Sequence, residues 1–223
     1  MMPLKTCAII PAYNEERYIS EVIRKAKKYV DSVIVVDDGS TDETFKRASD
    51  ADADIVLRHP VNIGKGFALE TGIEKALENG SDVIITLDGD NQHDPEDIKR
   101  LTGVLIDEDL DIVFGSRSLN REMPLILRFG NWWLCKSAKI LFGIDIRDSQ
   151  SGFKAFRREV YEKIRWKSIY YSVDSEIIMN VGKNGLRYKE IPIRTIYHCK
   201  HKGTTIIDGI RIFLYMLLWR VRG

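Results

Sequence analysis

Residues Val83 to Gln92 read V-I-I-T-L-D-G-D-N-Q. The first five of these residues are apolar or β-branched, which predicts a strand buried on both faces, as in a parallel sheet. Two carboxylates, Asp88 and Asp90, follow directly at the carboxyl end of that strand. Because open α/β sheets bind their ligands at this edge, the stretch predicts a parallel sheet with a site on it.

The chain before and after this stretch repeats the alternation of short apolar runs with helical segments. The other predicted strands of the first half are Thr6–Ile10, Ser32–Val36, Ile55–Arg58 and Ile112–Gly115. The segments long enough for crossover helices are Glu16–Lys28, Asp42–Ala48, Gly66–Glu78 and Asp94–Glu108, with helix-start signals at Thr41 and at Asp94–Pro95. This order predicts the α/β class with a doubly wound, mostly parallel central sheet flanked by helices.

The second half of the chain is organised differently. Further strands are expected at Gly152–Phe156 and Tyr188–Ile193, with a helix at Ser175–Lys183 between them. Pro124–Phe142 is predicted to be an amphipathic helical insertion, and Ile206–Val221 a C-terminal amphipathic helix.

These two amphipathic segments are candidates for contact with a membrane surface. The longest uncharged run of the C-terminal segment, Ile212–Trp219, is eight residues long. A bilayer-spanning helix needs about 20, so we expect interfacial contact through Trp and Arg or Lys instead of a span. The alternative is that both segments pack on the sheet as core and lid.

Composition sets outer limits. A chain of 223 residues with 44% hydrophobic and 30% charged residues fits one α/β domain without a second large one. Its three isolated cysteines (Cys7, Cys135 and Cys199) suggest reduced thiols in a cytosolic setting. Met1–Ala12 carries one Lys and no small-residue cleavage site, so it is expected to be a first strand and not a signal peptide.

The charge is unevenly distributed along the chain. The formal net charge is only +1, yet residues 1–116 have a net charge of −11 and residues 117–223 a net charge of +12. An acidic half suits a divalent cation, and a basic half suits phosphates or an anionic membrane surface. The alternative is that two oppositely charged surfaces only keep the protein soluble, which would give the same net charges in the two halves.

Two strand ends carry residues suited to a nucleotide. Pro11-Ala12-Tyr13-Asn14-Glu15 follows the first strand, where a Pro–aromatic turn can form a wall for a base and ribose. Asp37-Asp38-Gly39-Ser40-Thr41-Asp42 follows the second, where a carboxylate can bond a base N–H or a ribose hydroxyl. Each run also reads as an ordinary turn that leads into a helix.

Two later strand ends suit a metal ion and a phosphate. Asp88 and Asp90 can converge on one Mg²⁺ or Mn²⁺, with Gln92 adding an amide oxygen. His93 is expected to pack or cap instead of acting as a ligand. Arg117, after the fifth strand, can grip a phosphate bidentately.

Together these runs resemble the family 2 glycosyltransferases of GT-A (Rossmann-like) fold. The resemblance is carried by P-A-Y-N-E, V-D-D-G-S-T-D, N-I-G-K-G, D-G-D-N-Q, G-S-R and D-S-Q-S-G-F-K, and spans roughly residues 4–208. Within that family the chain is similar to dolichol-phosphate mannose synthases and polyprenyl-phosphate glycosyltransferases. The resemblance implies a glycosyltransferase domain over residues 1–205, which includes an amphipathic membrane-interface insertion at 121–145. A C-terminal amphipathic helix at 206–223 follows it.

The resemblance also implies roles for particular residues. Those implied to contact the nucleotide donor are Pro11, Ala12, Tyr13, Glu15, Asp38, Lys65 and Asp88. Those implied to form the metal cluster are Asp88, Asp90 and Gln92, of which Asp90, with Arg117 and Lys202, is also expected to serve catalysis. Those implied on the acceptor phosphate and sugar side are Arg117, Arg128, Ser151, Glu176 and Lys202, with Asp148 and Gly152 beside the sugar pocket.

One segment departs from the family pattern. Mannose-transferring members often carry an R-x-x-G-x-S-K-like stretch where this chain has His198-Cys199-Lys200-His201-Lys202-Gly203-Thr204-Thr205. The basic character is kept, but the difference leaves the donor open between GDP-mannose and a UDP-hexose. Two His flank Cys199, but a metal site there is disfavoured because Lys200 and Lys202 would repel a second cation.

The expected reaction is inverting transfer of the sugar to a polyprenyl or dolichyl phosphate, for glycan assembly at the cytoplasmic face of a membrane. Such an acceptor is already an anion and needs no strong base, so Asp174 and Glu176 are expected to bind or orient other groups. The alternative is a member that acts on a saccharide hydroxyl, with one of these carboxylates as base. No nucleic acid partner is expected.

Other classes fit the sequence less well. A processive polysaccharide synthase would carry Q-x-x-R-W after the acidic segment that contains Asp174 and Glu176. The only similar run here, Glu162–Trp166, begins with Glu and precedes that segment. A dinucleotide-binding oxidoreductase would need G-x-G-x-x-G after the first strand, where this chain has Pro11 and Tyr13. A P-loop protein would need G-x-x-x-x-G-K-[ST], and Asn62–Gly66 lacks that spacing. A catalytically inactive scaffold is disfavoured by the intact Asp88 and Asp90 pair.

Overall fold

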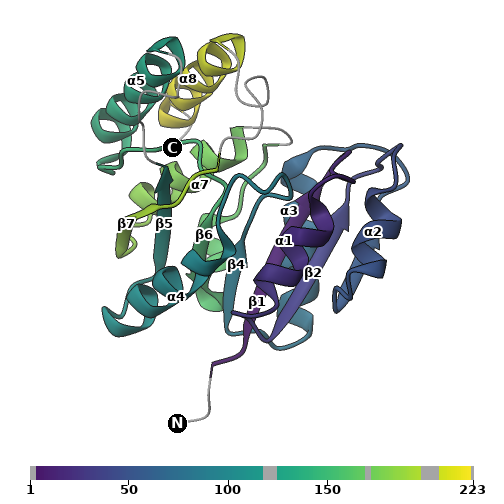
Figure 1. Cartoon of the computed structure of the whole chain (residues 1–223). Helices are drawn as coiled ribbons and strands as arrows, with labels where there is room; N and C mark the ends of the chain where they lie inside the picture. The colour runs from purple at the N-terminus through teal and green to yellow at the C-terminus, as the bar shows by residue number, and fades with distance from the viewer. Residues whose placement is uncertain (1–3, 118–124, 169–171, 197–205, 222–223) are drawn as a thin grey trace.

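The computed structural model is a twisted seven-stranded sheet with helices on both faces (Figure 1). It describes residues 4–117, 125–168, 172–196 and 206–221. The strands are β1 (Thr6–Ala12), β2 (Ser32–Asp37), β3 (Ile55–Arg58), β4 (Val83–Thr86), β5 (Ile112–Arg117), β6 (Lys154–Arg157) and β7 (Tyr188–Ile193). Their order across the sheet is β3-β2-β1-β4-β6-β5-β7. All pairs are parallel except those of β6, which runs antiparallel to β4 and to β5.

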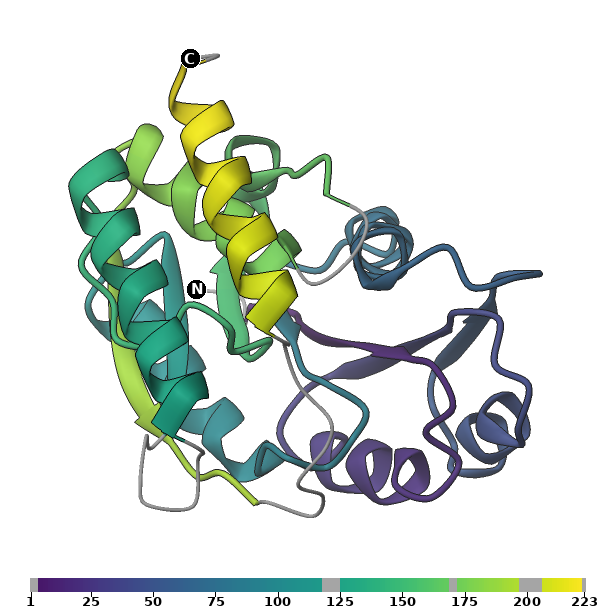
Figure 2. The same ribbon diagram turned by 90° about the horizontal axis from the view of Figure 1, so that it is seen from above.

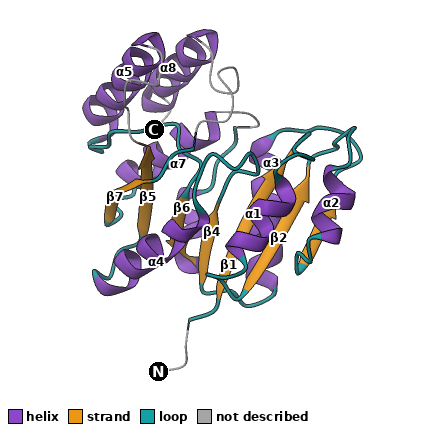
Figure 3. Ribbon diagram, in the orientation of Figure 1, coloured by secondary structure: helices purple, strands orange, loops and turns teal. Residues whose placement is uncertain are grey.

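Helices follow most strands, as the alternation of the sequence predicts (Figure 3). The α-helices are α1 (Ile19–Ala26), α2 (Thr44–Asp50), α3 (Lys65–Glu78), α4 (Ile98–Asp107), α5 (Leu125–Phe142), α6 (Tyr161–Ile164), α7 (Ser172–Lys183) and α8 (Ile206–Val221). Two 3₁₀ turns, η1 (Pro95–Asp97) and η2 (Arg158–Val160), precede α4 and α6.

The sheet separates two hydrophobic cores. On β1, Ile9 faces the core beneath α3, α5, α7 and α8, whereas Ile10 faces the core beneath α1, α2 and α4. Successive residues of a strand point to opposite faces, so a strand covered on both faces must be apolar throughout. This is the physical reason that the strand runs are continuous and not alternating, and the mostly parallel α/β sheet is confirmed.

Strand boundaries match the predictions closely, and helix starts less so. Ile55–Arg58 and Tyr188–Ile193 are strands as predicted, and Asp94 caps η1 by accepting a hydrogen bond from the Glu96 N–H. The Thr41 helix-start prediction was wrong, because α2 begins at Thr44. The Asp42 carboxylate accepts the Thr44 N–H there, which makes Asp42 the residue that stabilises this start.

The other differences are shifts at the starts of two elements. The predicted strand at Gly152–Phe156 begins only at Lys154, and Gly152 before it lies against the Asp88 carboxylate. The predicted helix Ser175–Lys183 begins earlier, at Ser172, so its first turn includes Asp174. Lys154 at the start of β6 and Asp174 in the first turn of α7 form an ion pair.

Helices α5 and α8 lie side by side above the β5–β7 end of the sheet (Figures 1 and 2). The ring centroids of Trp133 and Phe213 are 5.7 Å apart across this contact, and Ile212 and Met216 of α8 are buried. The C-terminal helix therefore packs on the domain. The division at residues 205 and 206 stays a prediction.

The outer faces of these two helices are apolar. Their exposed large hydrophobic residues are Phe129, Trp132, Trp133 and Ile140 on α5, and Ile210, Leu214, Tyr215, Leu217 and Leu218 on α8. Their spacings of three, four and seven residues form one stripe along each helix. Within the described part of the chain, none of the helices is long and apolar enough to pass through a bilayer.

Candidate active site

The turns after β1 and β2 are bonded to each other. Asn14, in the left-handed region at φ 54°, donates its N–H to Ser40 Oγ (2.9 Å) and accepts the Thr41 N–H (2.9 Å). The Glu15 N–H donates to Thr44 Oγ1 at 2.8 Å. The two predicted nucleotide segments therefore form one continuous wall at the carboxyl edge of the sheet.

The predicted nucleotide contacts differ in exposure along this wall. Pro11 and Ala12 are buried in the end of β1, whereas 44% of the Tyr13 surface is exposed at its tip. An exposed aromatic ring above a buried turn is suited to stack on a planar base. Glu15 is half-buried beside it.

Asp38 holds a loop together. It is buried, and its Oδ1 lies 2.7 Å from His59 Nδ1 and accepts the Ile63 N–H, while its Oδ2 accepts the Gly64 N–H at 2.8 Å. The prediction that Asp38 contacts the nucleotide stays a prediction. In the structure its carboxylate shapes the segment that leads to Lys65.

Two glycines make that segment possible. A Cβ on Gly39 would lie 2.3 Å from the carbonyl carbon of Val61, so only glycine lets the two loops touch. Gly64 has φ 106°, a conformation that L side chains rarely adopt, and α3 begins at the next residue. Lys65 is thus fixed in the first turn of α3.

Lys65 joins two acidic residues that are far apart in the sequence. Its Nζ lies 2.8 Å from Asp88 Oδ1 and 3.2 Å from Asp174 Oδ2. Burial by itself would lower the pKa of Lys65, but Asp174 and Asp88 outweigh it and raise the pKa above its ordinary value. Burial likewise would raise the pKa of Asp88, and the Lys65 charge instead holds it well below its usual range.

Asp88 also rests on the predicted sugar-pocket segment. A Cβ on Gly152 would lie 2.4 Å from Asp88 Oδ2, so the carboxylate occupies the space that a side chain would need. The neighbouring Ser151 is buried, and its carbonyl oxygen accepts a hydrogen bond from Lys154 Nζ at 2.6 Å. The structure therefore brings Gly152 against Asp88, while the roles of Ser151 and Gly152 at the sugar pocket stay predictions.

Asp90 completes the pair and lacks the compensation that Asp88 has. Its Oδ1 accepts the Gln92 N–H at 3.0 Å, so the turn is closed through Gln92. Burial and then the charge of Asp88 raise its pKa. Two carboxylates held this close in a partly dry site are suited to a divalent cation.

His93 lies beneath this pair and is fully enclosed. It is 3% exposed, its ring centroid lies 5.5 Å from that of Phe153, and its Nδ1 lies 3.9 Å from Asp88 Oδ2. Burial lowers its pKa. The packing role predicted for His93 agrees with this position.

The oxygen set of this turn fits Mg²⁺ or Mn²⁺. Among the described residues, no three His, Cys, Asp or Glu side chains gather into a closed metal site. Asp88 and Asp90 would therefore hold the cation with the Gln92 amide, and a bound diphosphate and water would supply the remaining ligands. An open site of this kind is the usual one for Mg²⁺.

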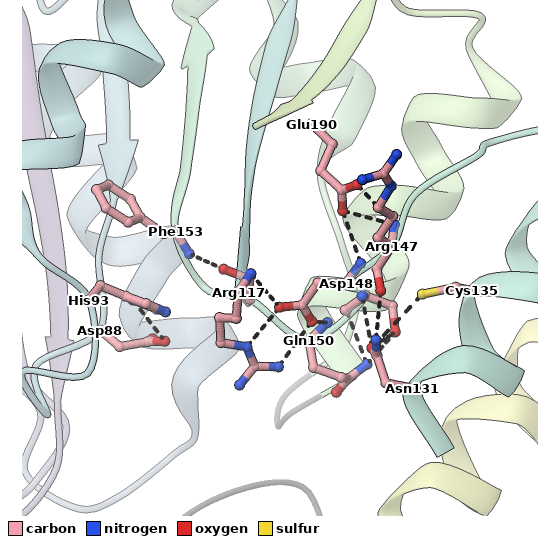
Figure 4. A network of polar contacts seen from close by, with 12 residues as sticks. Asp88, His93, Arg117, Asn131, Cys135, Arg147, Asp148, Gln150, Phe153 and Glu190 are labelled. Carbon is pink, nitrogen blue, oxygen red and sulfur yellow. Dashed lines mark hydrogen bonds and ion pairs between the residues drawn. The ribbon is translucent and has the colours of Figure 1, made fainter. Parts of the chain in front are cut away.

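Arg117 is anchored by a buried carboxylate (Figure 4). Its Nε lies 2.7 Å and its Nη2 3.0 Å from the two oxygens of Asp148, and its N–H donates to the same residue. Burial would raise the pKa of Asp148, but Arg117 holds it below the ordinary value. The edge of Arg117 best suited to a bidentate phosphate contact is thus bonded to Asp148.

A second acidic residue supports that anchor. Glu190 of β7 accepts the backbone N–H groups of Arg147 and Asp148, at 2.9 Å each through Oε1. Asn131 of α5 donates to the Arg147 carbonyl at 2.7 Å. Strand β7 and helix α5 therefore fix the loop that holds Arg117.

The first turn of α7 contacts three other segments through consecutive residues. Asp174 bonds Lys154 and Lys65, and Ser175 accepts a hydrogen bond from Gln150 Nε2 at 3.0 Å. Glu176 is buried and accepts the N–H groups of Lys167 (3.1 Å) and Ser168 (2.9 Å). Both late carboxylates are therefore engaged with protein groups.

Two further basic residues were predicted for the site. Lys202 and the whole of His198–Thr205 lie outside the described residues, so the roles predicted there stay predictions. Arg128 lies half-buried in the first turn of α5, and no described contact links it to Asp88 or Arg117.

Comparison with known proteins identifies the family. Residues 7–165 match the family model described as glycosyl transferase family 2. The chain belongs to this family. It is therefore a glycosyltransferase, and the segments shared with the family include the Asp88–Gln92 turn and Arg117.

Individual relatives agree with this membership. This glycosyltransferase is 35% identical over 240 residues to the UDP-N-acetylglucosamine–dolichyl-phosphate N-acetylglucosaminyltransferase of Methanococcus voltae, covering 96% of this chain and 95% of the relative. It is 30% identical over 233 residues to the dolichol-phosphate mannosyltransferase of Pyrococcus furiosus, covering 97% of this chain and 64% of that one.

A solved structure confirms the GT-A fold. Glucosyl-3-phosphoglycerate synthase from Mycobacterium tuberculosis, in complex with Mn²⁺, uridine diphosphate and phosphoglyceric acid, superposes with a TM-score of 0.76 at 23% identity. The match covers 97% of this chain and 78% of that chain.

Sequence reasoning missed two supporting residues. Lys154 is 1% exposed in the middle of G-F-K-A-F, and a lysine within a buried apolar run was a signal that it had an acidic partner. Glu190 is half-buried beside exposed Lys189 in Y-K-E-I-P-I, so its sequence surroundings carried no such signal. Neither partner was identifiable without the sheet order.

Proposed function

We propose that this glycosyltransferase moves a sugar from a nucleoside-diphosphate donor onto a polyprenyl (dolichyl-type) phosphate, with inversion at the anomeric carbon. The observation that carries the proposal is the engagement of both late carboxylates. Asp174 is bonded to two lysines and Glu176 to two backbone N–H groups. Neither is placed as an available general base.

The engagement of both described carboxylates, Asp174 and Glu176, favours a phosphate acceptor. A sugar hydroxyl must lose its proton as it attacks, so a transferase with a hydroxyl acceptor needs a positioned general base. A phosphate monoester is already an anion near neutral pH, so its oxygen can attack without proton transfer. Catalysis then depends on position and charge.

The donor half of the site is argued from the other cluster. Tyr13 is exposed for a base, and Lys65 and the Asp88–Asp90 pair lie at the same sheet edge for the diphosphate. A divalent cation on the pair would neutralise the charge that builds on the leaving diphosphate. Lys65 adds a positive charge beside it.

The chemical step is a single displacement. An oxygen of the acceptor phosphate forms a bond to C1 of the sugar as the bond from C1 to the diphosphate oxygen breaks. The bonding electron pair leaves with the diphosphate, and no proton needs to move. Arg117, anchored by Asp148, supplies fixed positive charge on the acceptor side together with Arg128 and Lys202.

A lipid acceptor requires contact with a membrane, and α5 and α8 suit it. The exposed apolar stripe of α5 carries Trp132 and Trp133, and exposed Lys136 and Lys139 follow them on the same helix. Aromatic and cationic residues favour the membrane–water interface. We therefore propose peripheral attachment at the cytoplasmic face.

The names of the relatives support the same acceptor. Those of Methanococcus voltae and Pyrococcus furiosus are named for transfer to dolichyl or dolichol phosphate. Because their names differ in the sugar, they leave the donor to experiment.

The test has two arms. Thermal unfolding with Mn²⁺ and GDP-mannose, UDP-glucose or UDP-N-acetylglucosamine should show stabilisation by the donor that the folded state binds. That donor is then incubated with a polyprenyl phosphate, with the corresponding free polyprenol, and with oligosaccharides. Transfer to the phosphate alone supports the proposal, and transfer to a saccharide hydroxyl contradicts it.

A further inference from the structure

Four alternating charges run in a line through the site. Lys154 Nζ lies 2.5 Å from Asp174 Oδ1, Asp174 Oδ2 lies 3.2 Å from Lys65 Nζ, and Lys65 Nζ lies 2.8 Å from Asp88 Oδ1. Lys154 and Asp174 are buried, whereas the Asp88 side chain is 27% exposed. The line therefore begins in the core and ends at the open edge of the sheet.

The inner half of the line is fixed. Lys154 also donates to the Ser151 carbonyl, and it has almost no access to solvent. Separating this pair would leave a buried charge without a partner, which is strongly unfavourable. Asp174 is therefore a stationary negative charge, with one oxygen taken and the other turned to Lys65.

The outer half ends on a residue that should bind a cation. Asp88 Oδ1 is already in contact with the Lys65 ammonium, and a divalent cation on the same oxygen would meet that charge at short range. Asp90 has no such contact in the described structure. The candidate metal pair is thus half neutralised by the protein itself.

We propose that Lys65 is the counter-ion of Asp88 when no ligand is bound. When a divalent cation and a diphosphate bind together, the cation replaces the Lys65 ammonium at the Asp88 carboxylate. Asp174, held by Lys154, then keeps the ammonium beside Asp88 and ready for a diphosphate oxygen. Lys65 in this way opposes the metal alone and favours the metal with the nucleotide. The inference rests on the donor half of the proposed function.

The test measures binding and needs no lipid acceptor. Isothermal titration calorimetry is used with Mn²⁺ alone, and then with uridine or guanosine diphosphate at saturating Mn²⁺, whichever the wild type binds. Lys65→Met should bind Mn²⁺ alone about fivefold more tightly or better, because the competing charge is gone. The same variant should bind the diphosphate at least about fivefold more weakly. A fivefold change in each affinity is at the low end of the usual coupling between two binding sites.

A second variant predicts the opposite sign for the metal. Asp174→Asn removes the second partner of Lys65 and leaves Lys154 unneutralised, so both positive charges oppose the cation. It should bind Mn²⁺ alone more weakly than the wild type. Damage to the fold would weaken Mn²⁺ binding in both variants, so the opposite signs separate a charge effect from a structural one.

The matched control lies on the same helix. Lys75 of α3 pairs with Glu78 at the surface, 2.9 Å away, and Lys75→Met makes the same chemical change outside the site. It should alter neither affinity by more than about twofold. Thermal unfolding checks that each variant is folded, and Lys65→Gln replaces Lys65→Met if the latter is not.

The outcomes separate the inference from the proposed function. If the wild type binds Mn²⁺ and diphosphate but removal of the Lys65 charge does not tighten Mn²⁺ binding, the counter-ion role is overturned and the proposed function stands. If the wild type binds neither, both are overturned. Tighter Mn²⁺ binding with weaker diphosphate binding supports the inference.

Discussion

Gly152 lies directly against the carboxylate of Asp88: a Cβ at this position would be 2.4 Å from Oδ2 and 2.5 Å from Oδ1. The contact joins the turn before β6 to the turn after β4, and it makes the absence of a side chain at residue 152 a requirement of the acidic pair. Any larger residue must displace Asp88 from its position beside Lys65.

We therefore expect Gly152→Ala to weaken binding of Mn²⁺ and of the nucleotide donor by about tenfold or more. Forcing a methyl group into a filled space costs roughly 1–3 kcal/mol, which movement of the carboxylate would relieve. Calorimetry measures the affinities and thermal unfolding the stability. Gly103→Ala in α4, where a Cβ would meet nothing within 4 Å, is the control and should leave donor binding unchanged.

Glu176→Gln tests whether a base is needed. The amide keeps one acceptor oxygen but turns an NH₂ group toward one of the two backbone N–H groups, so we expect a loss of about 1–2 kcal/mol of unfolding free energy. The rate of sugar transfer should stay within about tenfold of the wild type, since removal of a true general base typically costs 10²-fold or more. Loss of transfer with intact donor binding would contradict the base-free reaction.

Asp148→Asn should destabilise the protein in a way that depends on pH. Removing one partner of a buried ion pair leaves Arg117 uncompensated, so we expect a loss of about 3 kcal/mol near pH 7. The folded-state pKa of Asp148 is lower than its unfolded value, so the pair stabilises above about pH 4 and this contribution is lost as the pH falls below it.

Urea unfolding from pH 7 to pH 2.5 checks this prediction. The difference between the wild type and Asp148→Asn should be constant down to about pH 4.5 and shrink at lower pH. Asp145→Asn is the control, because Asp145 pairs with Lys139 at the surface and should alter stability little. A difference that stays constant through the acid range would contradict the assigned role of Asp148.

Membrane attachment is tested on the exposed stripes of α5 and α8. Trp132 is 50% and Leu214 52% exposed, so replacing both with Ser should weaken binding to anionic vesicles roughly tenfold with little change in stability. Ile106→Ser is the control, because Ile106 is 41% exposed on α4, which covers the opposite face of the sheet. Absence of wild-type binding at low salt would end the membrane proposal.

Most of the fold was predictable because burial leaves a local signal. The continuous apolar runs, such as Val83–Leu87, predicted strands covered on both faces, and the structure has strands at these positions. The direction of β6 was not predictable, since an apolar run reads the same in a parallel or an antiparallel neighbour. Strand β6 lies antiparallel between β4 and β5, and this position depends on how the chain reverses before β6, not on the residues of the strand.

The same division holds for the site. The acidic turn at Asp88–Gln92 and the family were predictable from the residues alone, because chemistry concentrated at one strand end is visible without coordinates. The partners of the charged residues became known only from the fold: Lys65 reaches Asp174 across 109 positions of sequence, and Arg117 reaches Asp148 across 31. The physical reason is that an ion pair depends on which strand ends the sheet order brings together, and no local pattern of residues records that choice.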